Sequence, residues 1–202
     1  MLTRIWERFW LGYNREGGFE GDEYLAEEIA DLIRRMSIKT TVETGTGYGR
    51  TTARLAKMAD KVYTVEKDVG KRRKIERRLG KLTNVKYFFG DSATVLRERI
   101  LSGISPPVLF YLDAHQMGNI ATLLNELQAI SEFPEYKNSA IVIHDFYVPD
   151  KNFWHNGYRY EQIVDLLMKI NPGHRYYYNT KASGAYRGVI FICPKEVLPE
   201  SI

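Results

Sequence analysis

Three glycines and a glutamate form a stretch of the chain that suits ligand binding. The segment VETGTGYG places Gly45, Gly47 and Gly49 at alternate positions, with Glu43 two residues ahead of the first. Glycine loses more conformational freedom on folding than any other residue, so this spacing indicates that a ligand needs the backbone bare. Backbone N–H groups at the start of a helix attract anions. We therefore expect a ligand with an anionic group at this loop.

Two further acids follow at intervals that suit an adenosine ligand. Glu66 ends an alternating stretch (61–66) and lies 23 residues after Glu43. A carboxylate at this spacing can accept both ribose hydroxyls, in NAD enzymes as in others. Asp91, after the next such stretch, can accept a hydrogen bond from an adenine amino group, and Ser92 can cap the next helix. A role for Asp91 as a helix cap alone carries equal weight.

Strand and helix patterns alternate five times along the chain. Apolar or alternating stretches predict strands, and apolar residues three and four apart predict helices. The strands are 42–44, 61–66, 84–89, 107–114 and 140–145, and the helices after them are 49–59, 67–81, 92–101, 120–130 and 159–170. This order predicts a parallel sheet with helices on both faces, in which ligands bind beyond the carboxyl ends of the strands. Two last strands, 174–179 and 187–193, are close enough in sequence to pair antiparallel.

From about Ile38 to Asp145 the chain resembles the class I S-adenosylmethionine (SAM) dependent methyltransferases. The motifs that carry the resemblance are VETGTGYG, VYTVEKD, VKYFFGDS, VLFYLDAH and IVIHDF. The order LDAH, LLNELQAI and IVIHDFYVP is further similar to a bacterial subgroup of cephalosporin-biosynthesis and rhamnosyl O-methyltransferase-like proteins. The resemblance implies an α/β fold with a Rossmann-like, doubly wound, mostly parallel seven-stranded sheet. One strand is antiparallel, and helices cover both faces.

The resemblance also implies the cofactor and its contacts. An NAD fingerprint would place a glycine or alanine at Arg50, whereas acid-x-G-x-G-x-G is the SAM pattern. Glu43 would complement the SAM ammonium group, Glu66 would bind the ribose and Asp91 the adenine. The implied cofactor-binding residues are Glu43, Thr44, Gly45, Gly47, Tyr48, Glu66, Asp91, Ser92 and Asp113.

The next two strand ends carry groups that can activate a hydroxyl. Asp113 ends one strand, His144 and Asp145 end the other, and the family arrangement makes these strands neighbours. Methyl transfer is an in-line displacement that requires an aligned nucleophile and, for a hydroxyl, loss of its proton. Two carboxylates and an imidazole can bind Mg²⁺ or Mn²⁺, which lowers the pKa of a coordinated oxygen. Catechol-type O-methyltransferases place metal ligands at similar strand ends, which carries that role onto Asp113 and Asp145.

Two departures from the catechol-type pattern leave a metal-free site open. Phe146 follows Asp145 where those enzymes have an asparagine, and DAHQM offers no lysine base. His115 is the first candidate for a general base and His144 the second, with Asp113 positioning the hydroxyl. The metal site and the metal-free site have equal weight.

The length, composition and net charge of the chain limit the class of protein. A chain of 202 residues that is 44% hydrophobic suits one domain. We expect a cytoplasmic protein, because no apolar run reaches membrane-spanning length, no signal peptide is apparent, and Cys193 is the only cysteine. The net charge of +4 comes mainly from 67–81, with eight Lys or Arg against two acids. A solvated outer helix is the preferred interpretation of that segment, and RNA, DNA or an acidic partner are the alternatives.

We predict a single domain, 1–202, with an N-terminal helical cap (1–37) and a Rossmann-like core (38–202). The predicted function is SAM-dependent O-methylation of a small-molecule or saccharide hydroxyl. The alternatives are a nucleic-acid (RNA) methyltransferase that uses the basic segment, and a non-catalytic protein that binds SAM or a nucleotide. We expect no membrane partner. Aromatic residues near the amino terminus cap the core, form a homodimer contact or cover the ligand: Trp6, Phe9, Trp10, Tyr13 and Phe19.

Overall fold

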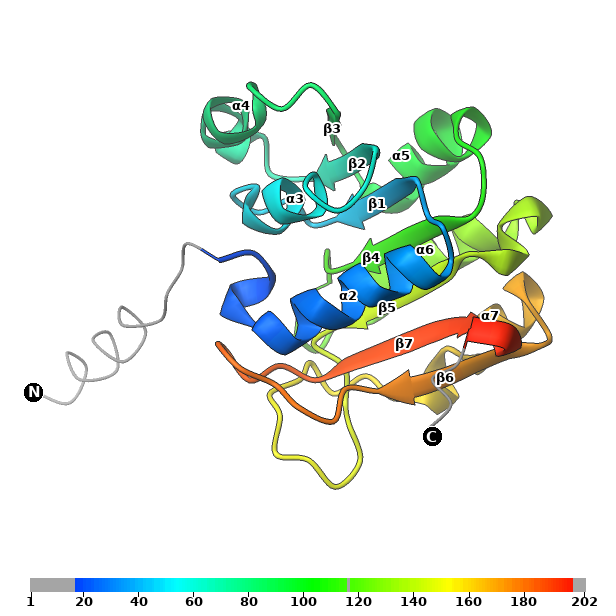
Figure 1. Cartoon of the computed structure of the whole chain (residues 1–202). Coiled ribbons are helices and arrows are strands. Elements are labelled where there is room, and N and C mark those ends of the chain that lie inside the picture. The colour runs from blue at the N-terminus through cyan, green and yellow to red at the C-terminus, as the bar shows by residue number, and fades with distance from the viewer. Residues whose placement is uncertain (1–16, 116, 198–202) are drawn as a thin grey trace, which may run out of the picture.

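A seven-stranded sheet forms the centre of the computed structural model, which describes residues 17–115 and 117–197 (Figure 1). The strands are β1 (Thr40–Thr44), β2 (Lys61–Glu66), β3 (Val85–Phe89), β4 (Val108–Leu112), β5 (Ala140–His144), β6 (His174–Tyr178) and β7 (Val189–Pro194). Their order is β3-β2-β1-β4-β5-β7-β6. β7 runs antiparallel to the other six strands, which are parallel to one another. The α/β fold and sheet predicted from the sequence are confirmed.

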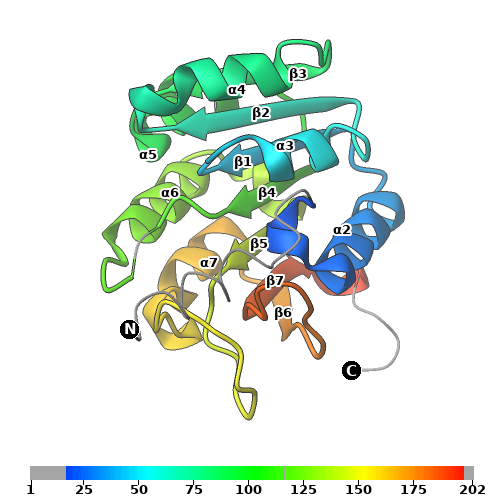
Figure 2. The ribbon, with the colours of Figure 1, turned by 90° about the vertical axis from the view of Figure 1, so that its left-hand side faces the viewer.

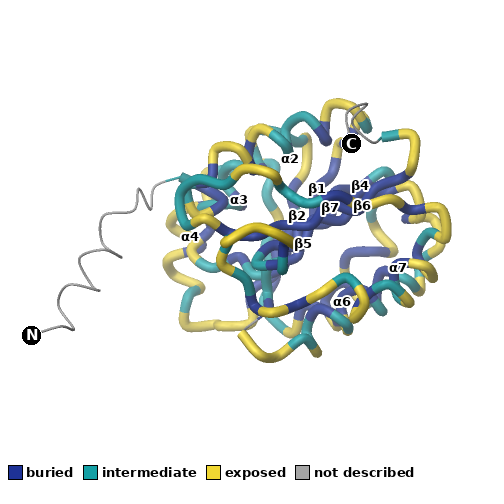
Figure 3. Tube along the Cα trace, turned by 90° about the horizontal axis from the view of Figure 1, so that it is seen from below, coloured by how far each residue is buried: buried dark blue, intermediate teal, exposed yellow. Residues whose placement is uncertain are grey.

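The central strands are covered on both faces. Every residue of β1, β4 and β5 is buried, and these strands form the dark-blue centre of the tube in Figure 3. Parallel strands need such cover, which is why β4 and β5 are continuous apolar runs in the sequence. In the edge strand β3 Phe88 is the one buried residue, Lys86 is exposed, and the other three are half-buried.

The helices are α2 (Glu23–Arg35), α3 (Arg50–Leu55), α4 (Arg72–Leu79), α5 (Ser92–Val95), α6 (Ala121–Ser131) and α7 (Val164–Ile170). The Asp22 carboxylate caps α2 by accepting a hydrogen bond from the Leu25 N–H at 3.1 Å. The last turn of α2 carries Arg34 and Arg35, whose charges complement the helix dipole. The apolar face of this helix is buried at Leu25, Ile29, Leu32 and Ile33.

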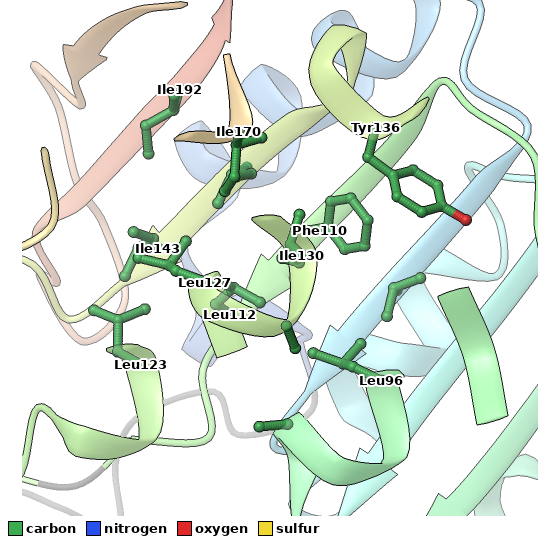
Figure 4. Packing of buried hydrophobic residues seen from close by; sticks show 14 of the residues in the cluster. Leu96, Phe110, Leu112, Leu123, Leu127, Ile130, Tyr136, Ile143, Ile170 and Ile192 are labelled. Atoms are coloured by element: carbon green, nitrogen blue, oxygen red, sulfur yellow. The ribbon is translucent and has the colours of Figure 1, made fainter. Parts of the chain in front are cut away.

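Two layers of helices enclose the sheet (Figure 2). Apolar residues of α2 pack with one face of β4, β5 and β7. On the other face, α5, α6 and α7 pack in the larger cluster. In Figure 4, Leu123 and Leu127 of α6 lie over the sheet near Leu112 of β4 and Ile143 of β5. Burying one such leucine contributes about 2 kcal/mol.

Several predicted helices are shorter or less regular than their patterns. The helix predicted over 49–59 ends at Leu55. Asn84 explains this ending, because its side-chain amide donates to the Ala56 and Ala59 carbonyls at 2.8 and 3.1 Å. The helix predicted over 92–101 continues from α5 into a π-turn, Leu96–Ile100.

The amino-terminal part of the described chain packs into the core. Phe19 is 1% exposed and meets Tyr111 of β4 edge-on, with ring centroids 5.5 Å apart. Its N–H donates to Thr51 Oγ1 at 2.9 Å. The other aromatic residues of the predicted cap, Trp6, Phe9, Trp10 and Tyr13, lie outside the described residues.

Candidate functional site

The glycine loop, formed by Gly45, Gly47 and Gly49, follows β1. Their φ angles are +85°, +57° and +75°, in the region that residues with a Cβ rarely adopt. A Cβ on Gly45 would lie 2.4 Å from the Asp113 carbonyl oxygen, and one on Gly49 would lie 3.0 Å from Leu79. A Cβ on Gly47 would meet only the Gly45 carbonyl, 3.9 Å away. Packing therefore explains why Gly45 and Gly49 have no side chain, whereas the space beside Gly47 is open to a ligand.

Glu43 lies buried beneath this loop. Its Oε2 accepts hydrogen bonds from the Thr52 and Thr64 hydroxyls, both at 2.5 Å. Burial raises the pKa of Glu43 to about 7, although these two hydroxyls oppose the shift. Glu43 therefore holds β1, β2 and α3 together, and its predicted contact with an ammonium group stays a prediction.

Glu66 joins the end of β2 to the glycine loop. Its Oε2 accepts from the Gly47 N–H at 2.8 Å and from Lys71 Nζ at 3.2 Å, and its Oε1 accepts from the Asp68 N–H at 2.9 Å. A carboxylate has about four acceptor positions, so these bonds leave about one free. Glu66 could accept from both ribose hydroxyls if Lys71 moved aside. The Lys71 side chain is 30% exposed.

The end of β3 differs in one detail from its prediction. Asp91, not Ser92, is the N-cap of α5, with its Oδ1 accepting from the Thr94 N–H at 3.1 Å. The prediction that Ser92 caps this helix is wrong, because Ser92 lies in the first turn with its side chain buried. Asp91 is exposed and its second oxygen is free of hydrogen bonds to described residues, and its predicted contact with an adenine amino group stays a prediction. Tyr48 is also exposed, by 47%, at the rim of the loop.

Glu126 of α6 is a buried carboxyl that the sequence prediction missed. The Ser92 and Thr44 hydroxyls face it, but neither has hydrogen-bond geometry, and both carboxyl oxygens are buried without a partner in the described part of the chain. Burial raises its pKa to about 7. Its position three residues after Leu123 and four before Ile130 places it on the apolar stripe of α6, which is the signal that could have revealed it.

Asp113, His144 and Asp145 come together at the ends of β4 and β5, which are adjacent as predicted. His144 Nδ1 lies 3.3 Å from Asp113 Oδ1 and 3.4 Å from Asp145 Oδ1. One nitrogen or oxygen of each residue lies within 4.8 Å of the others. Asp145 has a φ of +57°, so its backbone is held in the left-handed region at this site.

The charges in this cluster depend on one another. Burial lowers the pKa of His144, but the carboxylates of Asp113 and Asp145 outweigh burial and raise it above its ordinary value. Burial raises the pKa of Asp145, opposed by His144 and Arg187. Without a cation, a protonated His144 balances the acids.

The cluster fits a divalent cation in the identity and spacing of its donor atoms. Two carboxylate oxygens and one imidazole nitrogen are ligands that Mg²⁺ or Mn²⁺ can use. Asp145 Oδ1 is buried and accepts no hydrogen bond within the described residues, with His144 Nδ1 and Arg187 Nη1 each 3.4 Å away, so a cation could take its open acceptor position. His144 must lose its proton before it can act as a ligand.

His115 lies beside the cluster with both ring nitrogens inside the protein. Its Nε2 donates to the His144 carbonyl oxygen at 2.8 Å, and its Nδ1 is buried without a hydrogen-bond partner among the described residues. Burial lowers its pKa, so the imidazole is neutral near pH 7. A general base must reach the proton that it removes. The role of His115 as a base stays a prediction, and reaching an acceptor would require the ring to move.

Arg187 is a second residue that the sequence prediction missed. Its Nε lies 2.7 Å from Glu20 Oε2, its Nη1 lies 3.4 Å from Asp145 Oδ1, and its guanidinium stacks 3.8 Å from the Trp154 ring centroid. The backbone N–H of Trp154 donates to the Tyr186 carbonyl at 2.8 Å, which ties the loop after β5 that contains Trp154 to the segment of this arginine. Arg187 follows Asp145 by 42 residues, so no local pattern signals the contact.

No protein-family model matches the chain, and no curated protein sequence does. Solved structures do. An amino pentose methyltransferase of calicheamicin biosynthesis from Micromonospora echinaspora is 13% identical, with 93% of this chain and 95% of that one covered and a TM-score of 0.62. A Klebsiella pneumoniae protein described as an O-methyltransferase is 17% identical, with coverages of 85% and 80% and a TM-score of 0.59. A Streptococcus thermophilus rRNA methylase is 14% identical, with coverages of 83% and 94% and a TM-score of 0.53.

These likenesses show the fold. The chain has the Rossmann-like fold that these methyltransferases share. The names of these proteins refer to a sugar in one case and to an RNA in another, so the fold alone does not identify the methyl acceptor. In the described part of the chain, the structure contains no helix with the length and apolar character of a membrane span.

Proposed function

We propose that this protein is a SAM-dependent methyltransferase that methylates a hydroxyl of a small molecule or a saccharide. The observation that carries the proposal is the edge of the sheet where β3, β2, β1, β4 and β5 end. Asp91, Glu66, the glycine loop, Asp113 and His144 follow one another there in the spatial order of the strands. Ligands of such sheets bind outside these carboxyl ends, at the point where the strand order reverses.

The cofactor would lie across the β1 end. Gly47 offers open backbone, Glu66 on one side offers acceptors for ribose hydroxyls, and Asp91 beyond it offers an acceptor for adenine. The amino-acid end of SAM would then point toward Asp113. The methyltransferase from Micromonospora echinaspora that shares this fold has SAM bound, which supports the same cofactor here.

The acceptor hydroxyl would lie at Asp113, His144 and Asp145. Asp113 and Asp145 can accept hydrogen bonds from the hydroxyl and hold its oxygen in line with the methyl group. In a metal-free site His144 can take the proton when the oxygen attacks only after losing its own, because, despite burial, the neighbouring carboxylates raise its pKa. In the alternative, a divalent cation held by these three residues would supply a positive charge that lowers the pKa of the hydroxyl, and His144 would then be a ligand and not the base. Arg187 positions Asp145, and the Trp154 ring, 39% exposed, is available to an acceptor ring or sugar face.

Calorimetric titration of the metal-stripped protein with SAM tests the cofactor. Glu66→Ala should weaken SAM binding by about tenfold or more, because two charged hydrogen bonds to the ribose are lost. Glu76→Ala removes an exposed acid of α4 and is the matched control. Binding that is absent in the unchanged protein, or equal in all three proteins, would contradict the proposal.

A second titration tests the cation and the reaction. Mg²⁺ should give a separate binding heat that Asp145→Asn removes, with SAM binding retained. Release of S-adenosylhomocysteine with a panel of hydroxyl acceptors then separates an enzyme from a non-catalytic SAM-binding protein. SAM binding without turnover on any acceptor would favour the non-catalytic alternative.

A further inference from the structure

The charge of the chain is concentrated in one segment. Residues 67–81 contain eight Lys or Arg and two acids, a net charge of +6, whereas the whole chain has +4. The rest of the chain therefore has a net charge of −2. The high pI is a property of this segment and not of the surface in general.

The structure leaves these charges unpaired and facing solvent. Only Ile75 and Leu79 of α4 are buried, and they hold the helix against the protein. Lys71 forms the one ion pair that the described part of the chain shows for this segment, with Glu66. Seven other cations are exposed and form no ion pair with a described residue: Lys67, Arg72, Arg73, Lys74, Arg77, Arg78 and Lys81. Figure 3 shows α4 largely in the colour of exposed residues.

Aromatic rings lie directly under two of the cations. The Arg72 guanidinium is 4.6 Å from the Phe89 ring centroid, and Lys74 Nζ is 4.7 Å from the Tyr48 ring centroid. The Tyr48 ring is 47% exposed. Cations that alternate with accessible rings suit a strand of nucleotides, because the phosphates meet the cations and the bases stack on the rings.

The basic surface also adjoins the glycine loop. Arg78 donates to the Tyr48 carbonyl oxygen at 2.9 Å, and Leu79 fills the space that the missing side chain of Gly49 leaves. In Figures 1 and 2, α4 lies at the β3 end of the sheet, away from β6 and β7. A nucleic-acid strand bound on α4 would therefore pass the side of the site where the cofactor is proposed to bind.

We infer that α4, with Tyr48 and Phe89, is a docking surface for single-stranded nucleic acid. A lipid surface fits less well, because helices that bind membranes expose bulky apolar residues on one face. Here the apolar residues of α4 are 0% and 1% exposed, and the exposed large apolar side chains nearby in the described residues are Val69 and Tyr48. The inference does not depend on which group the protein methylates.

Fluorescence anisotropy of the full chain with a labelled 20-nucleotide RNA tests the inference. The variant Arg73→Glu/Arg77→Glu reverses two exposed charges one helical turn apart, and neither side chain forms a hydrogen bond or ion pair with a described residue. Lys137→Glu/Lys169→Glu makes the same change in net charge at two exposed positions near the other end of the sheet. Calorimetry with SAM on each variant reports the cofactor site separately.

The unchanged protein should bind the RNA, with affinity that falls steeply as salt rises. The Arg73→Glu/Arg77→Glu variant should bind the RNA about tenfold more weakly. Its slope of log K against log salt should be smaller in magnitude by about 1.4, which is about 0.7 for each of two lost phosphate contacts. The control variant should bind like the unchanged protein. Comparison with single-stranded DNA, duplex RNA and anionic lipid vesicles identifies the partner, and single strands should bind tightest.

Equal weakening by both variants, or binding to vesicles alone, would overturn the inference. Preference for a duplex would also overturn it, because stacked bases could not use the two rings. Loss of RNA binding with SAM binding intact leaves the proposed function in place, so the two ideas fail separately.

Discussion

Replacing Glu126 with glutamine should remove a loss of stability that the protein suffers as pH rises. Both carboxyl oxygens of Glu126 are buried without a hydrogen-bond partner among the described residues, and burial raises the pKa from 4.5 to about 7. The folded protein therefore disfavours the charged form. Glutamine has nearly the same shape and no charge, so it reports the cost of ionising this one group.

The sign and size of the effect follow from the two pKa values. Because the folded pKa is the higher one, the stabilisation by neutral Glu126 is complete below about pH 4.5 and is lost as pH rises through about 7. The shift corresponds to about 3 kcal/mol once the group is fully charged. The stability of Glu126→Gln relative to the unchanged protein should rise by about that amount between about pH 4.5 and 8.

Urea denaturation at four pH values across this range measures the difference. Any cost of the buried amide is the same at every pH, and Glu43, which has a similar shift, is present in both proteins. Glu98→Gln, an exposed acid with no ion pair in the described residues, is the control and should follow the unchanged protein. Stability curves of the unchanged protein and Glu126→Gln that run parallel across the range would refute the reasoning, because they would mean that Glu126 ionises without penalty.

Three further substitutions test other contacts. Gly45→Ala should destabilise the protein by about 2 kcal/mol or more and weaken SAM binding. The reason is that the φ of Gly45 is +85° and the new Cβ would lie 2.4 Å from the Asp113 carbonyl oxygen. An unchanged melting temperature would contradict this prediction. Arg187→Met should cost about 2–3 kcal/mol by removing one of the two cationic neighbours of Asp145 and leaving His144, with Arg187→Lys recovering part of the loss in thermal melts. Phe19→Ala should cost about 3–4 kcal/mol in chemical denaturation, since the ring is 1% exposed, and a cost below about 1 kcal/mol would place it outside the core.

Which elements form is largely readable from local patterns. The continuous apolar runs predicted buried strands at β4 and β5 because both faces of a parallel strand are covered. The polar residues that end those strands could be placed together in advance, because parallel strands bring their carboxyl ends to one edge. Asp113, His144 and Asp145 meet there, as predicted.

Contacts between distant segments could not be read in this way. Asn84 ends a helix that lies 25 and more residues before it, and the pattern of that helix carries no sign of the amide. The sequence offered both Asp91 and Ser92 as the cap of α5, and the structure decides for Asp91, whose carboxylate accepts from the Thr94 N–H.

The sequence by itself determined the order of strands and helices, the carboxylates at the strand ends and the excess of positive charge on one segment, because composition and periodicity are local properties. Only the tertiary structure decided how those groups are used. Packing against Asp113 and Leu79 explains Gly45 and Gly49, and leaves Gly47 open for a ligand. The pairing of Arg187 with Asp145 and the burial of Glu126 likewise depend on segments that meet only when the chain folds, since burial and ionic contact are properties of neighbours in space.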